Sequence, residues 1–208
     1  MRLFILFSLL TSFKALAHPV SFKDAIGVMS YNSSQMNELM VTYSLSSQMA
    51  LGHTYIREKK SEFYIPRVNF LARRWYNENS QGNLYLSAGS GLEKYASKNS
   101  NVHLGAVVAD WESRKHYVYL EHLYMLRDNQ DNPLWLQRDD NHSKVRAGFA
   151  PFLADYKDLN VWFIAQLTKH NDETAQATQF LRFYMKNTLW EIGADFNGGF
   201  AFNFMIHI

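Results

Sequence analysis

The sequence predicts an all-β fold: an antiparallel up-and-down transmembrane β-barrel of about twelve strands, with ten as the alternative count. Two observations lead to this prediction. Large hydrophobic residues alternate with smaller or polar ones over segments of about ten residues, and clusters of turn-forming residues separate the segments. After residue 17, no apolar stretch approaches the roughly 20 residues that a spanning helix needs. Closing such a sheet pairs every backbone group and leaves no edge.

Residues 1–17 are interpreted as a cleaved signal peptide. Arg2 gives a positive start, residues 3–13 are almost wholly apolar, and Ala15-Leu16-Ala17 supplies a small-x-small cleavage pattern. The apolar run is too short to span a membrane as a helix. We therefore expect the mature chain to begin at His18 and residues 18–208 to form one domain.

Charge and cysteine content exclude several classes of function. The chain has 21 Lys and Arg against 19 Asp and Glu. Removing residues 1–17 takes away Arg2 and Lys14 but no acid, which leaves 19 of each sign. A neutral chain without a basic run gives no support for a nucleic-acid partner. With no cysteine, disulfides, thiolate nucleophiles and cysteine metal sites are excluded.

The C-terminal segment has the clearest strand pattern. Large hydrophobic side chains occupy alternate positions to the last residue, at Phe200, Phe202, Phe204, Ile206 and Ile208. A strand places all of these on one face, whereas a helix would scatter them. The same alternation predicts strands near residues 22–31, 37–46, 48–58, 63–77, 82–93, 101–112, 116–128, 143–154, 158–169, 177–186, 188–196 and 199–208.

The lengths of the links predict an orientation. In membrane barrels of this type the periplasmic turns are short, the outer loops are longer, and both termini are periplasmic. If the first strand runs outward, the links after even-numbered strands should be short. They are short near residue 47 and at 78–82, 112–115, 155–158 and 186–188, while the links at 31–36, 94–101, 129–143 and 170–176 are longer. Two outer links, near 59–62 and 197–198, do not follow the pattern.

The size of the barrel indicates which face meets lipid. A twelve-stranded barrel encloses more space than side chains fill in an eight-stranded one. We therefore expect the hydrophobic face to contact lipid and the charged face to line a lumen. The predicted luminal residues are Arg67, Arg73, Lys144, Arg146, Arg182, Glu191 and Asp195.

These luminal charges suggest a function. The basic members, together with Lys186, could form a stripe that faces a set of acids, and such a field selects small charged solutes by sign. The acids are Asp110, Glu112, Glu121, Glu191 and Asp195. The alternative is that the charges pair with one another and plug the lumen.

Four tryptophans fall near the inner ends of their predicted strands. Trp111 and Trp190 have outward parity, as expected of an interfacial aromatic girdle. Trp75 and Trp162 have inward parity and are expected to pack inside the barrel mouth.

The last strand, with Phe200, Phe202, Phe204, Ile206 and Ile208, resembles the assembly signal of bacterial outer-membrane β-barrel proteins. That family usually ends in an aromatic residue, and this chain ends in Ile208. The resemblance points to no particular subfamily. It implies an outer-membrane location in a Gram-negative bacterium, with outer-membrane lipid and the barrel-assembly machinery as partners.

Some twelve-stranded members of that class are lipid enzymes, such as the outer-membrane phospholipase, and need a serine or an activated water beside a histidine. Asn141-His142-Ser143 supplies these residue types but lies in a run of turn formers, so we interpret it as a hydrated outer loop and predict no catalytic residue. An N-terminal His18 could bind copper, but Pro19 removes one amide ligand. The other histidines show no metal-ligand spacing, and no metal or other cofactor is expected.

The leading hypothesis is a narrow passive channel for small polar or charged solutes. The alternatives are a lipid-modifying hydrolase and a non-conducting structural or surface-interaction barrel.

Overall fold

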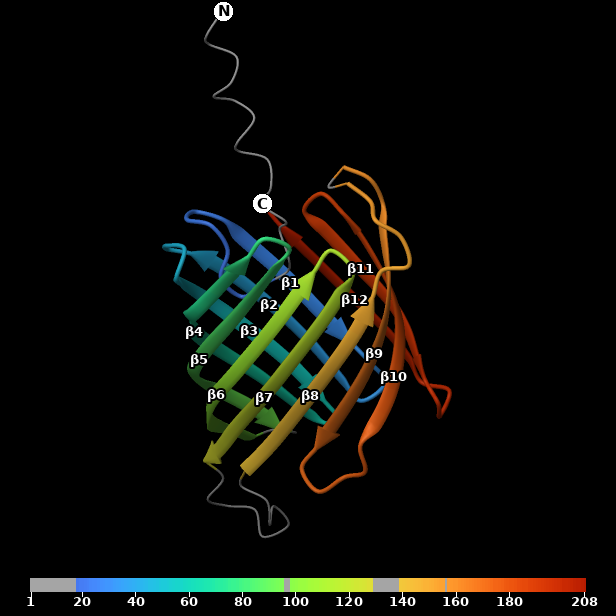
Figure 1. Cartoon of the computed structure of the whole chain (residues 1–208). Coiled ribbons are helices and arrows are strands. Elements are labelled where there is room, and N and C mark those ends of the chain that lie inside the picture. Colours follow the sequence, from blue (N-terminus) through green and yellow to red (C-terminus); the bar gives the residue numbers. More distant parts are fainter. Residues whose placement is uncertain (1–17, 96–97, 129–138, 156) are drawn as a thin grey trace, which may run out of the picture.

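The computed structural model of the chain describes residues 18–95, 98–128, 139–155 and 157–208. Within these residues there are twelve β-strands (Figure 1). The strands are β1 (Ile26–Asn32), β2 (Met36–Ser44), β3 (Met49–Glu58), β4 (Ser61–Asn77), β5 (Ser80–Tyr95), β6 (Lys98–Ser113), β7 (His116–Asp128), β8 (Asp139–Phe149), β9 (Asn160–His170), β10 (Gln176–Met185), β11 (Thr188–Asp195) and β12 (Phe200–His207). The predicted signal peptide lies outside the described residues.

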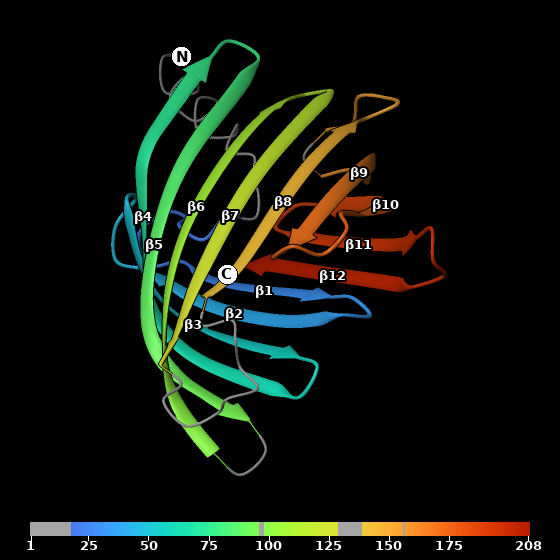
Figure 2. The same ribbon diagram turned by 90° about the horizontal axis from the view of Figure 1, so that it is seen from below.

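The sheet closes on itself. Each strand pairs antiparallel with its neighbour in sequence, and β1 closes the ring by pairing with β12 from Gly27↔His207 to Asn32↔Phe202 (Figure 2). The predicted fold class is therefore confirmed, with twelve strands rather than ten. No helix in the described part of the chain is long and apolar enough to cross a membrane.

Two strands differ most from their predicted bounds. β1 begins at Ile26 rather than near residue 22, because the residues before it turn into the barrel interior. β8 ends at Phe149, before Pro151, whereas the prediction carried it to residue 154. Proline lacks the N–H that a strand donates to the ladder, so the strand stops before it.

The C-terminus and the β10–β11 turn share one end of the barrel, called here the inner end (Figure 1). The β9–β10 link lies at the opposite, outer end. Short links at the inner end span residues 45–48, 78–79, 114–115 and 186–187, as predicted. The β8–β9 link at this end departs from the prediction: it spans residues 150–159, longer than predicted, because β8 stops before Pro151. At the outer end, the links predicted as longer at 31–36 and 94–101 are shorter than predicted, because β2 begins at Met36 after β1 ends at Asn32, and β6 begins at Lys98 after β5 ends at Tyr95.

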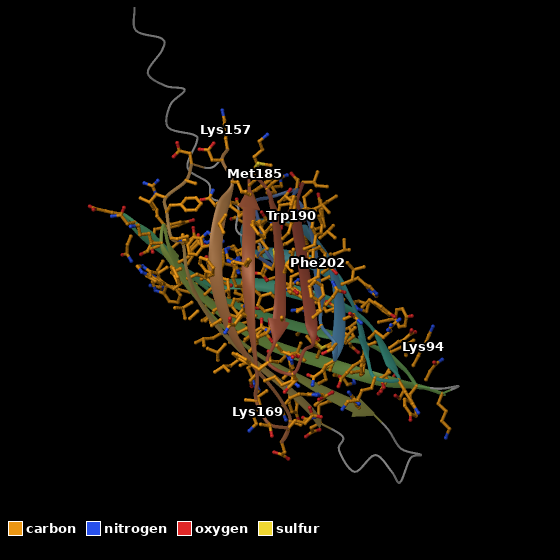
Figure 3. The ribbon with its side chains drawn as sticks, turned by 90° about the vertical axis from the view of Figure 1, so that its right-hand side faces the viewer. Lys94, Lys157, Lys169, Met185, Trp190 and Phe202 are labelled. Carbon is orange, nitrogen blue, oxygen red and sulfur yellow. The ribbon has the colours of Figure 1, made fainter. Side chains whose placement is uncertain are left out.

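The two faces of the sheet have opposite chemistry. Leu120, Phe163 and Phe202 are 41–48% exposed on the outer face. Figure 3 shows Trp190 and Phe202 on the strands nearest the viewer. The interior buries these charged residues: Glu38, Glu58, Arg67, Glu93, Asp110, Glu112, Asp140, Lys144, Arg146, Arg182 and Glu191. A soluble barrel has the reverse distribution, so the outer surface is the one that suits lipid.

All five hydrophobic residues of the C-terminal pattern lie on the outer face. Phe200, Phe202 and Ile208 are exposed there, and Phe204 and Ile206 are half-buried. Their side chains alternate with buried ones on the same strand, which is the parity that the sequence predicted. Their part in assembly stays a prediction.

The interior is not polar throughout, in contrast to the expected lumen. An apolar cluster fills its outer half beside β3, β4, β6 and β7, made of Ile56, Phe63, Ile65, Val102, Leu104, Ala106, Leu123 and Met125. In this part of the wall the backbones of β4 and β5 leave room only for glycine: a Cβ on Gly91 would lie 2.0 Å from the Tyr64 carbonyl oxygen of β4. The cluster restricts open space to the other side of the barrel.

A β-bulge in β4 reverses the predicted parity of its inner end. The register shifts between Leu71 and Arg73, so Leu71 faces inward opposite Tyr85 while Arg73 lies opposite Leu84 on the outer face. The extra residue in a bulge moves every later side chain to the other face. Arg73 is therefore not luminal, and that prediction was wrong.

Candidate functional site

The candidate site is a cavity inside the barrel, on the side of β1 and β8 to β12. It encloses about 1110 Å³ of non-protein space, counting its open mouths. At the outer end it is lined by Ser33, Gln176 and Asp195, and at the inner end by His18 and Asp110. Because these residues lie at opposite ends of their strands, the cavity runs along the barrel.

Glu191 of β11 organises the inner half of this passage. Its Oε2 accepts hydrogen bonds from Arg146 Nη2 at 2.7 Å and Asn203 Nδ2 at 2.6 Å, and its Oε1 accepts one from Arg182 Nε at 2.7 Å. All four residues are buried. Two guanidinium groups share one carboxylate, so the layer formed by Arg146, Arg182 and Glu191 has a net charge of about +1.

Aromatic rings hold the same two arginines from another side. The Arg182 guanidinium lies 4.3 Å from the centroid of the Tyr117 ring, and that of Arg146 lies 5.1 Å from the Phe180 ring. Cation–π contacts of this kind are favourable when desolvated. Both arginines are thus held from two sides, by the Glu191 carboxylate and by an aromatic ring.

The middle of the passage holds one charge pair. Lys144 Nζ of β8 donates to Glu121 Oε1 of β7 at 3.0 Å and lies 5.1 Å from the Tyr31 ring of β1. The Tyr119 hydroxyl also donates to Glu121. Since β8 and β1 are not neighbours in the ring, the Lys144 side chain reaches across the interior and narrows it.

At the outer end of the barrel, an ion-pair network crosses the interior. Arg127 of β7 forms ion pairs with Asp140 of β8, with Glu93 at 3.7 Å and with Glu58 at 4.0 Å. His170 Nδ1 of β9 lies 3.3 Å from Glu58 Oε1 of β3, and its Nε2 hydrogen-bonds with Asp140. β3 and β9 stand on opposite sides of the strand ring, so this network joins opposite walls.

Three residues of that network also have the composition of a metal site. Ligand atoms of Glu58, Asp140 and His170 all lie within 4.8 Å of one another. The group has no signature in the sequence, because its members come from three strands, β3, β8 and β9. The Arg127 guanidinium already forms ion pairs with both acids of this group, so its members also belong to an ion-pair network that needs no metal.

The structure places the remaining predicted luminal residues inside the barrel: Arg67, Lys144, Arg146, Arg182, Glu191 and Asp195. All but Arg67 line the passage. Arg67 is buried beside Thr54, with Nη1 3.4 Å from Oγ1. Asp195 also closes the β11–β12 turn by accepting from the Asn197 and Gly199 amides at 2.8 Å. Among the described residues of the passage, the basic side chains are paired with acids rather than gathered in a separate stripe: Arg146 and Arg182 share Glu191, and Lys144 pairs with Glu121.

The bulge in β4 also changes the face on which Trp75 lies. Trp75 faces outward, contrary to prediction, and the Arg73 guanidinium lies 5.9 Å from its ring centroid. Trp111 and Trp190 are exposed on the outer face, and Trp162 packs inside against the cluster of Ile164 and its neighbours, as their parity predicted.

The sequence predicted a hydrated outer loop at Asn141-His142-Ser143, and this prediction was wrong, because the three residues belong to β8. His142 and Ser143 are adjacent in β8 and face opposite sides: His142 lines the passage, whereas Ser143 is on the outer face. The Ser143 hydroxyl instead lies 2.9 Å from Nδ1 of His122 on β7. Lys169 of β9 is opposite Ser143. This contact could not be predicted from the sequence, because it depends on the register between β7 and β8, in which His122 is opposite Ser143.

Comparison with known proteins identifies the fold. No protein-family model and no curated protein matches the chain. Among solved structures, the KdgM porin in complex with disordered oligogalacturonate is similar, with a TM-score of 0.51 and 11% identity over 88% of this chain and 97% of the porin. A second KdgM porin structure gives 0.48 with 12% identity over 88% and 97%. OccAB4 of Acinetobacter baumannii gives 0.38 with 9% identity over 86% of this chain and 55% of that one. The chain thus has the fold of bacterial outer-membrane β-barrels.

Proposed function

We propose that this chain forms a narrow, passive channel for small polar or charged solutes in the outer membrane, with its inner end in the periplasm. The observation that carries the proposal is the passage along the barrel, lined by Lys144, Arg146, Arg182 and Glu191. Fixed charges and hydroxyl or amide groups along a narrow water-accessible path are what a selective pore needs. The similarity of the fold to the KdgM porin also supports a channel function.

The sign of the preferred solute follows from the inner layer. Arg146 and Arg182 face one carboxylate, that of Glu191, so an anionic group of a solute can complete their charge balance. We expect a mild preference for anions over cations. One similar porin was solved with oligogalacturonate, so this acidic oligosaccharide is a suitable first solute for this chain as well.

The test is single-channel recording in planar lipid bilayers with a salt gradient, using protein purified from outer membranes. Arg182→Gln should move the reversal potential toward cation selectivity. Arg73→Gln is the matched control. This substitution removes the same charge from the outer face, so it should leave the reversal potential unchanged. Folding of each variant is checked by heat-modifiable gel mobility. Absence of conductance in the folded unmodified protein would refute the proposal.

A second candidate function, a lipid-ester hydrolase, rests on one contact. The Ser143 hydroxyl and His122 Nδ1 are 2.9 Å apart on the outer face. This is the geometry of a nucleophile beside its general base, and it faces the side that meets lipid. Within the described residues the pair has no third hydrogen-bonded member, so the channel is the function that the geometry supports best.

Phospholipid hydrolysis by the purified barrel in mixed micelles separates the two candidates. If the pair is catalytic, Ser143→Ala and His122→Ala should each abolish turnover. His142→Ala should not, since His142 lies inside the barrel. No turnover by the unmodified protein, or turnover that survives Ser143→Ala, removes this candidate.

A further inference from the structure

The chain before β1 turns back into the inner mouth of the barrel. Asp24 adopts a left-handed conformation with φ of 67°, which Asp tolerates better than most residues. The Asp24 amide donates to the Ser44 carbonyl at 2.8 Å, and the Ser21 amide donates to Ser44 Oγ at 3.0 Å. These two bonds fix the turn at the end of β2.

Beyond this turn, Val20 anchors the segment inside the barrel. Its side chain is only 1% exposed and belongs to a cluster with Ala50 of β3, Leu71 of β4, Tyr85 of β5 and Val108 of β6. A side chain with these contacts is enclosed by the barrel wall, not resting on its rim. Burial of this apolar side chain favours the folded-in position of the segment.

His18 then reaches the passage itself. Its ring stacks on Tyr85 at 5.4 Å between centroids, and its Nδ1 lies 3.3 Å from Asp110 Oδ2. Its carbonyl oxygen lies 3.2 Å from Nε2 of His207 in β12. His18 therefore contacts β5, β6 and β12, and with Asp110 it lines the inner end of the cavity.

We propose that residues 18–21, the N-terminal plug, fill part of the inner mouth and set the conductance and upper solute size of the passage. This inference rests on the proposed channel function. The plug is held at the inner mouth by the buried side chain of Val20 and by the polar contacts of His18 and Ser21. Displacing it widens the mouth without breaking any strand pair.

The position of the plug is tested without measuring transport. The chain has no cysteine, so single cysteines can be introduced cleanly. Val20→Cys should react with a small charged maleimide at least about tenfold more slowly than Lys23→Cys, because the buried site reacts only after local opening. Lys23 is an exposed residue of the same segment. Equal labelling rates in the folded protein would overturn the proposal.

The effect of the plug is tested by conductance. Val20→Asp places a carboxylate in the apolar cluster and should expel the plug, which raises single-channel conductance and admits larger solutes. Phe22→Asp is the matched control, because Phe22 is 61% exposed and its replacement should leave conductance unchanged. Equal conductance of Val20→Asp and the unmodified protein would refute the proposed effect of the plug but not the channel function. Absence of conductance in every folded variant would overturn the channel as well, while the labelling rates still report the position of the segment.

Discussion

The Glu191 cluster gives a stability prediction whose size follows from the structure. Glu191 is 1% exposed and is the shared partner of Arg146 and Arg182. Breaking a buried ion pair by removing one partner costs about 3–5 kcal/mol, because the other charge stays buried. Glu191→Gln keeps the shape and one neutral hydrogen bond of about 1 kcal/mol, so we expect a net loss of about 2–4 kcal/mol.

The assay is urea unfolding of the barrel in lipid vesicles, followed by tryptophan fluorescence. The matched control is Glu173→Gln, which removes the same charge from the Lys59–Glu173 pair at 3.2 Å, where the side chains are 69% and 49% exposed. Exposed pairs of this kind contribute less than about 1 kcal/mol. Adding Arg146→Met to Glu191→Gln should recover part of the loss, since one unpaired charge is removed.

The refuting result is a Glu191→Gln variant whose free energy of unfolding falls no more than that of Glu173→Gln. The layer would then be hydrated well enough to leave its charges independent of one another. The assumption that two fixed guanidiniums depend on one carboxylate would fail, and the expected anion preference would lose its physical basis.

Two further predictions concern the wall of the barrel. Gly91→Ala should lower the free energy of unfolding by about 1–3 kcal/mol, because its Cβ would meet the Tyr64 carbonyl at 2.0 Å, whereas Gly105→Ala, with nothing within 4 Å, should change it by less than about 0.5 kcal/mol in the same urea assay. Phe202→Lys should cost about 2–4 kcal/mol in vesicles if this face meets the bilayer core. A change within about 0.5 kcal/mol, as for an ordinary surface position, would mean that Phe202 faces water.

Period-two alternation was sufficient to predict the fold. It survives in β12 because a strand with one face toward lipid repeats large hydrophobic residues from Phe200 to Ile208. The same alternation placed Arg146, Arg182 and Glu191 inside, since no irregularity interrupts β8, β10 or β11.

Parity failed where the chain departs from a regular strand. The bulge after Leu71 moved Arg73 and Trp75 to the outer face, and nothing in the local sequence marks it. The plug was missed because Val20 and His18 act through contacts with strands far along the chain. Which acid joins which base depends on the register between strands, and alternation within one strand does not define that register.

The contact between Glu58 and His170, backed by the apolar side chains around Phe63, has a consequence for what could travel through the barrel. These side chains fill the interior beside β3, β4, β6 and β7, and the open cavity lies along the opposite wall. If the proposed channel conducts, it should therefore select solutes by their width rather than by their mass. A linear oligomer could thread it in single file. A branched compound of equal molecular weight should be held at the entrance.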